Sequence, residues 1–178
     1  MPVEKIIYET SLDYNSIISS LESIIEPYNF LGFSIYGKPY NGTINMNSFK
    51  IKRHSMIIRN SFKPVIVGIV ETNGVNNIIR VKMRLNVFIK IFLILLLGLL
   101  NIIIPIIQLI GTIYIEKELL ISVLFYMLSG LLFSIIIFSI VTIFFKIESK
   151  ITKKYFKELL KAEMMEEKRI NILLKEII

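Results

Sequence analysis

The side chains that could do chemistry in this sequence are basic residues that alternate with apolar ones. The alternation runs through Phe49–Arg53 and again through Ile78–Leu85. Because neighbouring side chains of a strand point to opposite faces, two such strands in one sheet would place their basic residues on a single face. That face would carry Lys50, Lys52, Arg80, Lys82 and Arg84. It is either an ordinary solvated surface or a surface that attracts anionic lipid headgroups, to which each basic residue contributes about 1 kcal/mol.

A second set of polar side chains lies inside two long apolar segments. Asn101 and Gln108 fall on one helical face of the first segment, and Ser129 and Ser134 lie in the second. If the segments form an antiparallel helical hairpin, Asn101 reaches the depth of both serines. Interhelical hydrogen bonds of this kind contribute roughly 0.6–2 kcal/mol each. The same side chains could instead bind a second protomer or line a polar pathway, and the sequence leaves these three interpretations open.

Catalytic, cofactor-binding and metal sites are not expected. The sequence has no cysteine and a single histidine, His54, which removes thiolate chemistry and most histidine-based sites. No carboxylate lies near His54 in the sequence, so we interpret it as a surface or loop residue. The acidic residues are scattered, and no set of nucleophile, base and orienting group can be assembled from them. We therefore expect no enzymatic activity and no cofactor.

The two apolar segments predict a transmembrane hairpin. They run from about residue 91 to 113 and from 119 to 145, and neither contains a formal charge. At 1.5 Å per residue each exceeds the roughly 30 Å of a bilayer core. Residues 1–90 hold 11 Lys/Arg and 6 Asp/Glu, residues 146–178 hold 9 and 6, and the connection 114–118 holds 1 and 2. By the positive-inside rule, both termini are expected in the cytoplasm of a two-span protein of the cell membrane.

Residues 1–86 predict a small α+β domain. Lys5–Glu9 is a first strand by its β-branched composition, and the next apolar residues recur at helical spacing. This helix should be capped by Thr10 or Ser11 and ended by Pro27. Further short strands are predicted at Phe30–Tyr36, Thr43–Met46, Phe49–Arg53, Met56–Arg59, Val65–Glu71 and Ile78–Leu85. The short turns between them favour an antiparallel β-meander, with the N-terminal helix over one face.

The C-terminal residues predict a charged amphipathic helix. We expect it to continue from the second span into the cytoplasm and to dock on the sheet, with a short dimeric coiled coil as the alternative. The chain then divides into residues 1–86, a cytoplasmic α+β domain, residues 87–145, the transmembrane helical hairpin, and residues 146–178, the cytoplasmic amphipathic helix.

The segment Asn41–Leu85 contains FKIKR at 49–53, RNSFKPVIVG at 59–68 and VKMRL at 81–85. It resembles small two-span integral membrane proteins of Bacteroidetes-type bacteria that have no assigned activity. The resemblance implies a β-rich cytoplasmic part, a two-helix hairpin and a charged helix. Apart from the resemblance, Gly68 inside a strand predicts a bulge or a close backbone approach.

These features favour a membrane-anchored, non-enzymatic interaction or scaffold protein whose β-rich domain is held at the inner leaflet. The expected partners are the lipid bilayer, with its anionic headgroups, and a second copy of the chain or another protein. Nucleic acid is not expected, because aromatic residues are not interleaved with the basic ones as stacking requires. The alternative, suggested by Asn101 and Gln108, is a subunit of a small oligomeric transporter or channel.

Overall fold

The computed structural model describes residues 1–28, 37–54, 62–72, 76–103, 105–107, 110–111 and 119–165. The chain divides into two compact units. One contains Asn86–Phe144 together with Met1, and the other contains Pro2–Leu85 together with Phe145–Ile178. The segment that follows the second apolar run therefore belongs to the same unit as the N-terminal part and does not form a domain of its own.

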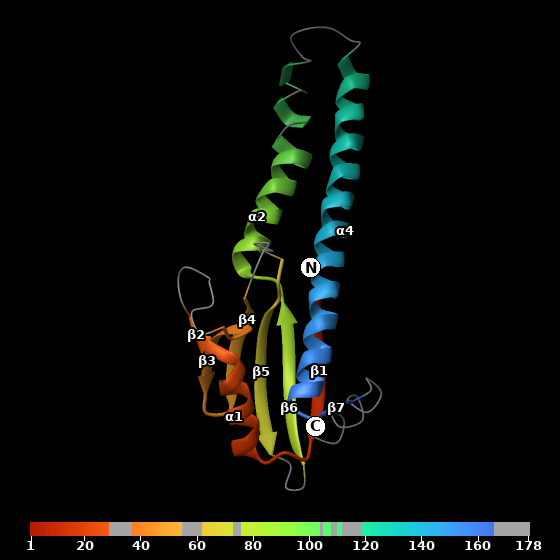
Figure 1. Ribbon diagram of the computed structural model, residues 1–178. Coiled ribbons are helices and arrows are strands. Elements are labelled where there is room, and N and C mark those ends of the chain that lie inside the picture. Colours follow the sequence, from red (N-terminus) through yellow and green to blue (C-terminus); the bar gives the residue numbers. More distant parts are fainter. Residues whose placement is uncertain are drawn as a thin grey trace, which may run out of the picture. The chain divides into compact units, whose positions relative to one another are not determined.

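The unit that contains Pro2–Leu85 and Phe145–Ile178 is called the α+β unit, and it is built on one mixed sheet (Figure 1). Its described strands are β1 (Val3–Thr10), β2 (Ile25–Pro27), β3 (Tyr40–Asn45), β4 (Ser48–Arg53), β5 (Val65–Thr72), β6 (Asn77–Arg84) and β7 (Glu163–Met164). The strand order is β2-β3-β4-β5-β6-β1-β7. Only β2 and β3 pair in parallel, and every other neighbouring pair is antiparallel. The predicted α+β class is confirmed at this level.

Strands β3 to β6 follow one another as antiparallel neighbours, while β1 and β2 flank them on opposite sides. Strands β1, β3, β4, β5 and β6 begin and end within a few residues of the predicted ones, whereas β2 and β7 were not predicted. Two further predicted strands, Phe30–Tyr36 and Met56–Arg59, lie outside the described residues, as does the predicted hairpin turn at Asn73–Gly74.

The described helices are α1 (Tyr14–Ile24), α2 (Val87–Gly98), the π-helical segment η1 (Leu99–Ile103) and α4 (Leu119–Leu159). The predicted cap of the first helix is wrong. The carboxylate of Asp13 caps α1 by accepting hydrogen bonds from the backbone N–H and the hydroxyl of Ser16. Thr10 is the last residue of β1 instead, opposite Asn77 of β6. The helix also ends before Pro27, because Ile25 is already extended and pairs with β3.

One face of the sheet carries the core of this unit. Its largest fully buried side chains include Tyr8, Tyr40, Ile51, Ile66, Ile79 and Met83. The ring of Phe156, on α4, lies among three of the sheet's aromatic rings. Its centroid is 6.0 Å from that of Phe49, 5.9 Å from that of Tyr40 and 6.4 Å from that of Tyr8. The prediction that the C-terminal helix continues from the second apolar segment and docks on the sheet is confirmed as far as Leu159.

The prediction of one helix over residues 146–178 is wrong between Leu160 and Met165, because α4 ends in a turn and strand β7 follows, while residues 166–178 lie outside the described residues. The N–H of Ala162 donates to the carbonyl of Lys157 (3.1 Å), and the N–H of Lys161 donates to that of Glu158 (3.3 Å). Lys161 has a φ of 46°, so these bonds form a Schellman motif with a lysine in the place that glycine normally takes. The hydroxyl of Thr10 donates to the carbonyl of Leu160 (2.7 Å). Without a glycine, the sequence carries no clear sign of this helix end.

The unit that contains Asn86–Phe144 is called the hairpin unit. Two apolar helical stretches have the length and composition of a membrane span, Val87–Ile107 and Leu124–Leu159. The second stretch continues beyond Phe144 into the α+β unit. Only 6% of the most apolar window of the first and 11% of that of the second is buried inside the protein. Large apolar side chains such as Phe88, which is 81% exposed, therefore face outward along both helices.

Candidate functional site

The register of the sheet places the predicted basic residues on one face. Lys50, Val67, Lys82 and Lys5 lie in one row across β4, β5, β6 and β1. The next row contains Lys52, Val65, Arg84 and Val3. Alternate residues of the same strands are buried in the core on the opposite side of the sheet. We call this surface, made by Lys5, Lys50, Lys52, Arg80, Lys82, Arg84, Val65 and Val67, the open face.

Lys5 belongs to the open face but was missed by sequence reasoning. Its strand was predicted from its β-branched composition, without an assignment of which residues face the core. What the sequence did not give is the pairing of β1 with β6, which sets Lys5 directly opposite Lys82.

The cations of the open face are not equivalent. The Nε of Arg80 lies 2.9 Å from the carboxylate of Glu71, so its charge is compensated locally. Burial lowers the pKa of Lys52 from its ordinary value. Lys5, Lys50 and Lys82 are exposed, and none of them makes an ion pair within the described ranges.

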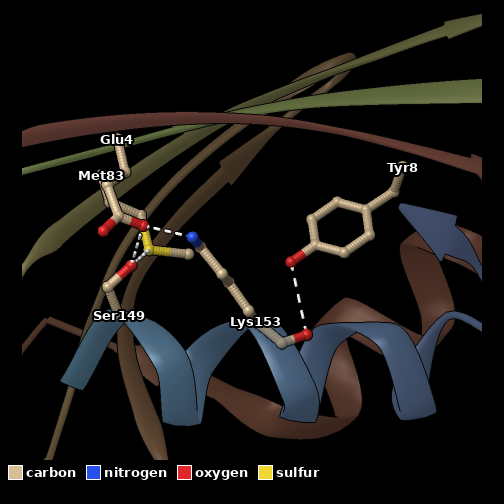
Figure 2. A network of polar contacts seen from close by, with 5 residues as sticks. All are labelled: Glu4, Tyr8, Met83, Ser149 and Lys153. Atoms are coloured by element: carbon tan, nitrogen blue, oxygen red, sulfur yellow. Dashed lines mark hydrogen bonds and ion pairs between the residues drawn. The ribbon is translucent and has the colours of Figure 1, made fainter. Parts of the chain in front are cut away.

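A polar network joins α4 to β1 on the buried side of the sheet, as Figure 2 shows. The carboxylate of Glu4 accepts a hydrogen bond from the hydroxyl of Ser149 (2.6 Å) and lies 2.5 Å from the Nζ of Lys153. The Ser149 hydroxyl also lies 3.2 Å from the sulfur of Met83. The phenol of Tyr8 donates to the backbone carbonyl of Lys153 (3.4 Å). These contacts fasten the helix across the sheet.

The electrostatics of this network favour a charged Glu4. Burial by itself raises the pKa of the Glu4 carboxyl, but the hydrogen bonds from Lys153 and Ser149, with the positive charges of Lys153 and Lys146, lower that pKa overall. Burial also raises the pKa of Tyr8 well above its ordinary value and raises that of Tyr40 to about 12. Both phenols therefore stay protonated near neutral pH.

The depressed pKa of Glu4 makes part of the stability pH-dependent. The stabilisation is fully present above the unfolded-state pKa, near 4.5, and is lost as the pH falls through the lower folded-state pKa. We expect Glu4→Gln to lower the thermal unfolding midpoint of the detergent-solubilised chain at pH 7, with a difference from the wild type that shrinks below that range. Glu22→Gln, at an exposed position of α1, is the control. A midpoint difference that is constant with pH would contradict the assignment.

A second buried polar cluster corrects the interpretation of His54. This residue is only 7% exposed, and its Nε2 lies 2.5 Å from the carboxylate of Glu26. The Nζ of Lys63 donates to the backbone carbonyl of His54 (2.6 Å). Arg53, the residue before His54 in the sequence, forms an ion pair with Glu148 of α4 at 3.4 Å. His54 follows the end of β4, as the interpretation of a loop residue allows, but its placement at the surface is wrong. The parallel pairing of β2 with β3 brings Glu26 to it from a distant part of the sequence.

In the hairpin unit, Asn101 makes the predicted contact with the second helix. Its side-chain amide donates to the hydroxyl of Ser134 (2.6 Å) and to the carbonyl of Leu97 (2.8 Å). The Ser134 hydroxyl donates in turn to the carbonyl of Gly130 (2.8 Å). A Cβ at Gly130 would lie 3.3 Å from the carbonyl oxygen of Leu100, so the missing side chain lets the two helices approach.

The other predicted interhelical residues differ from this pattern. Ser129 is exposed, and its hydroxyl donates to the carbonyl of Tyr126 in its own helix (2.9 Å). The described hydrogen bonds of Ser129 include none to the first helix, and its predicted interhelical role stays a prediction. Gln108 lies outside the described residues.

The two buried polar clusters and the open face differ in accessibility, since Glu26 and His54 are 1% and 7% exposed. Ser149 and Thr152 are almost completely buried under the sheet, so the Glu4 network serves packing. Among the described residues, no group of three or more His, Cys, Asp or Glu side chains is placed so that it could hold a metal ion. The open face, by contrast, presents its charges to the surroundings and is the candidate binding site.

No family model, curated protein or solved structure matches this chain.

Proposed function

We propose that this chain is a membrane-anchored, non-enzymatic interaction protein of a bacterial inner membrane. In this proposal the helical hairpin crosses the bilayer twice, and the α+β unit interacts with its partner through the open face. The observation that carries the proposal is the exposure of the two apolar helical stretches, of which 6% and 11% are buried inside the protein.

Two other kinds of helix have this composition, and both differ from the apolar stretches of this chain. The core helix of a soluble protein would have most of its apolar surface covered by the rest of the chain. A signal sequence would lie close to the N-terminus, whereas the first candidate span begins at Val87. An exposed apolar surface of this extent is costly in water and is typical of contact with lipid.

The distribution of charge supports an orientation with both termini in the cytoplasm. The segments before and after the hairpin are rich in Lys and Arg, and the connection 114–118 has a net negative charge. Short basic segments next to a span remain on the cytoplasmic side.

The structure gives the alternative, a transporter or channel subunit, no added support. Asn101 suggested that alternative, and it uses both of its amide hydrogens inside the hairpin. Within the described part of the first span, Val87–Ile107, the one formal charge is Lys90, near its beginning. A long lysine stem at that place can reach the headgroups.

The membrane proposal is tested by extraction and by labelling. We expect the full chain to stay with the membrane pellet after alkaline carbonate washing and to need detergent for release. Because the chain has no cysteine, single cysteines report topology without background. Lys117→Cys should react with an impermeant maleimide in intact spheroplasts, and Met46→Cys, at an 89% exposed position, should react only after lysis. Release by carbonate would refute the anchor, and the reverse labelling pattern would refute the orientation.

A further inference from the structure

The open face holds an arrangement of charge that the fold itself does not require. Lys5 and Lys82 are directly opposite each other on antiparallel strands, and Lys50 lies in the same row, beyond Val67. Like charges in directly opposite positions destabilise a sheet. The repulsion would be relieved by an anion bound between the lysines.

Two acidic residues of this side of the sheet, Glu9 and Glu71, lie away from the lysine row. A third, Glu26, extends the row of Lys52 beyond Asn41, and its carboxylate lies 2.5 Å from the Nε2 of His54. Glu9 and Glu71 share a row at the far end of the strands, with Ile78 between them. Glu71 is engaged by Arg80 (2.9 Å), and Glu9 accepts a hydrogen bond from the side chain of Asn76 (2.9 Å). Along β1, β5 and β6 the charge of the face therefore changes from acidic to basic, and the basic half contains Lys5, Lys50 and Lys82, which are exposed and have no described ion pair.

The apolar residues between the cations indicate which kind of anion fits. Val67 separates Lys50 from Lys82, and Val65 separates Lys52 from Arg84. A soluble polyanion gains little from contact with valine. The interfacial layer of a bilayer offers phosphate groups and acyl-chain surface together, which is the combination that basic surfaces with apolar side chains bind.

The position of the basic half in the chain agrees with a lipid partner. Arg84 precedes Val87, the first residue of the first candidate span, by three residues. A chain inserted in a bilayer therefore holds this end of β6 near headgroups, at a high effective concentration.

We propose that the open face binds the phosphate groups of anionic phospholipids, with Lys5, Lys50 and Lys82 as the cationic contacts and Val65 and Val67 against the apolar part of the lipid. This inference rests on the proposed membrane anchoring and names the partner of the same surface. It differs from simple charge attraction in requiring the central lysine row and not the net charge of the chain.

The test compares the wild type with lysine variants of the full chain in a neutral detergent. Phosphatidylglycerol or phosphatidylcholine is added, and the bound lipid is measured by native mass spectrometry. The wild type should retain phosphatidylglycerol in preference to phosphatidylcholine. Each basic residue near an anionic lipid surface changes affinity about fivefold, so Lys50→Gln/Lys82→Gln should weaken phosphatidylglycerol binding about 30-fold. The matched control is Lys150→Gln/Lys157→Gln, which removes two exposed lysines of α4 and lowers the net charge of +7 by the same amount.

The folding of the variants is checked in the same preparation. Because Lys82 is opposite Lys5, its neutralisation relieves a repulsion, and Lys50→Gln/Lys82→Gln should unfold at the same temperature as the wild type or higher. A loss of lipid binding in a variant of undiminished stability assigns the loss to the contact.

Three results would overturn the inference. One is a wild type with no preference for phosphatidylglycerol, and another is an equal loss of preference in both double variants. The third is tight binding of a soluble poly-glutamate peptide without any preference for phosphatidylglycerol, which would assign the open face to an acidic protein segment. Each of these leaves the carbonate extraction of the wild type unchanged, so failure of the lipid site is distinguishable from failure of the membrane anchor.

Discussion

Phe156→Ala should destabilise the α+β unit by about 3–5 kcal/mol, the range for removing a fully buried aromatic ring. Phe156 is 0% exposed and is the only residue with described ring contacts to three sheet residues, Tyr8, Tyr40 and Phe49. The cavity would lie between α4 and the middle of the sheet. The neighbouring rings come from separate strands, β1, β3 and β4, whose backbones are fixed by their ladders, so the gap cannot close by local collapse.

Hydrogen exchange of the full chain in detergent measures this effect in the sheet alone. The slowest amides of β4, β5 and β6 should exchange at least a hundredfold faster in the variant, because they open with the global free energy of their unit. Ile151→Ala is the matched control on the same helix, since Ile151 is 43% exposed, and it should leave these rates nearly unchanged. Equal acceleration in both variants would show that the docking of α4 does not depend on the Phe156 ring.

Gly68→Ala should destabilise the same unit by about 1–3 kcal/mol, through overpacking. Gly68 lies within the β5 ladder, in register with Phe49 on one side and Val81 on the other. A Cβ at this position would lie too close to the Cζ and the Cε1 of Phe49 for any real contact. That ring is 2% exposed and stacks on Phe156, so it has nowhere to move. The continuous register also shows that the bulge predicted at Gly68 is wrong, and that the close approach comes from a side chain and not from backbone.

A double-mutant cycle isolates the Gly68–Phe49 contact. Phe49→Leu makes room above residue 68 at a cost of its own. In that background, Gly68→Ala should cost less than in the wild type, giving a coupling energy of about 0.5–3 kcal/mol by hydrogen exchange or thermal unfolding. Gly98→Ala is the control, because a Cβ there meets nothing within 4 Å. Strict additivity of Gly68→Ala and Phe49→Leu would contradict the steric explanation.

Several features of the protein followed from short stretches of sequence. The apolar segments predicted two long exposed helices, because hydropathy is a property of consecutive residues. The period of two in Phe49–Arg53 and Ile78–Leu85 assigned Lys50 and Lys82 to the side opposite the core, since the pleat fixes where alternate side chains point. The depth of Asn101 relative to Ser134 followed from the helical rise and a short connection.

Other features depended on pairs of residues far apart in the chain. Glu26 and His54 meet because β2 pairs in parallel with β3. Glu4 meets Ser149 and Lys153 because α4 crosses β1, and Lys161 ends that helix in a conformation that a lysine seldom adopts. The like-charge pair Lys5–Lys82 exists only because β1 pairs with β6.

The sequence by itself determined five of the described strands, the polar and apolar sides of β4 and β6 and the two candidate spans, because these depend on periodicity and hydropathy over a few neighbouring residues. The tertiary structure decided which strands are neighbours, what covers the core and which charges meet. Those outcomes depend on packing between segments far apart in the sequence, separated by 145 residues for Glu4 and Ser149 and by 150 for Thr10 and Leu160. The geometry that selects one pairing over another exists only once the chain has folded.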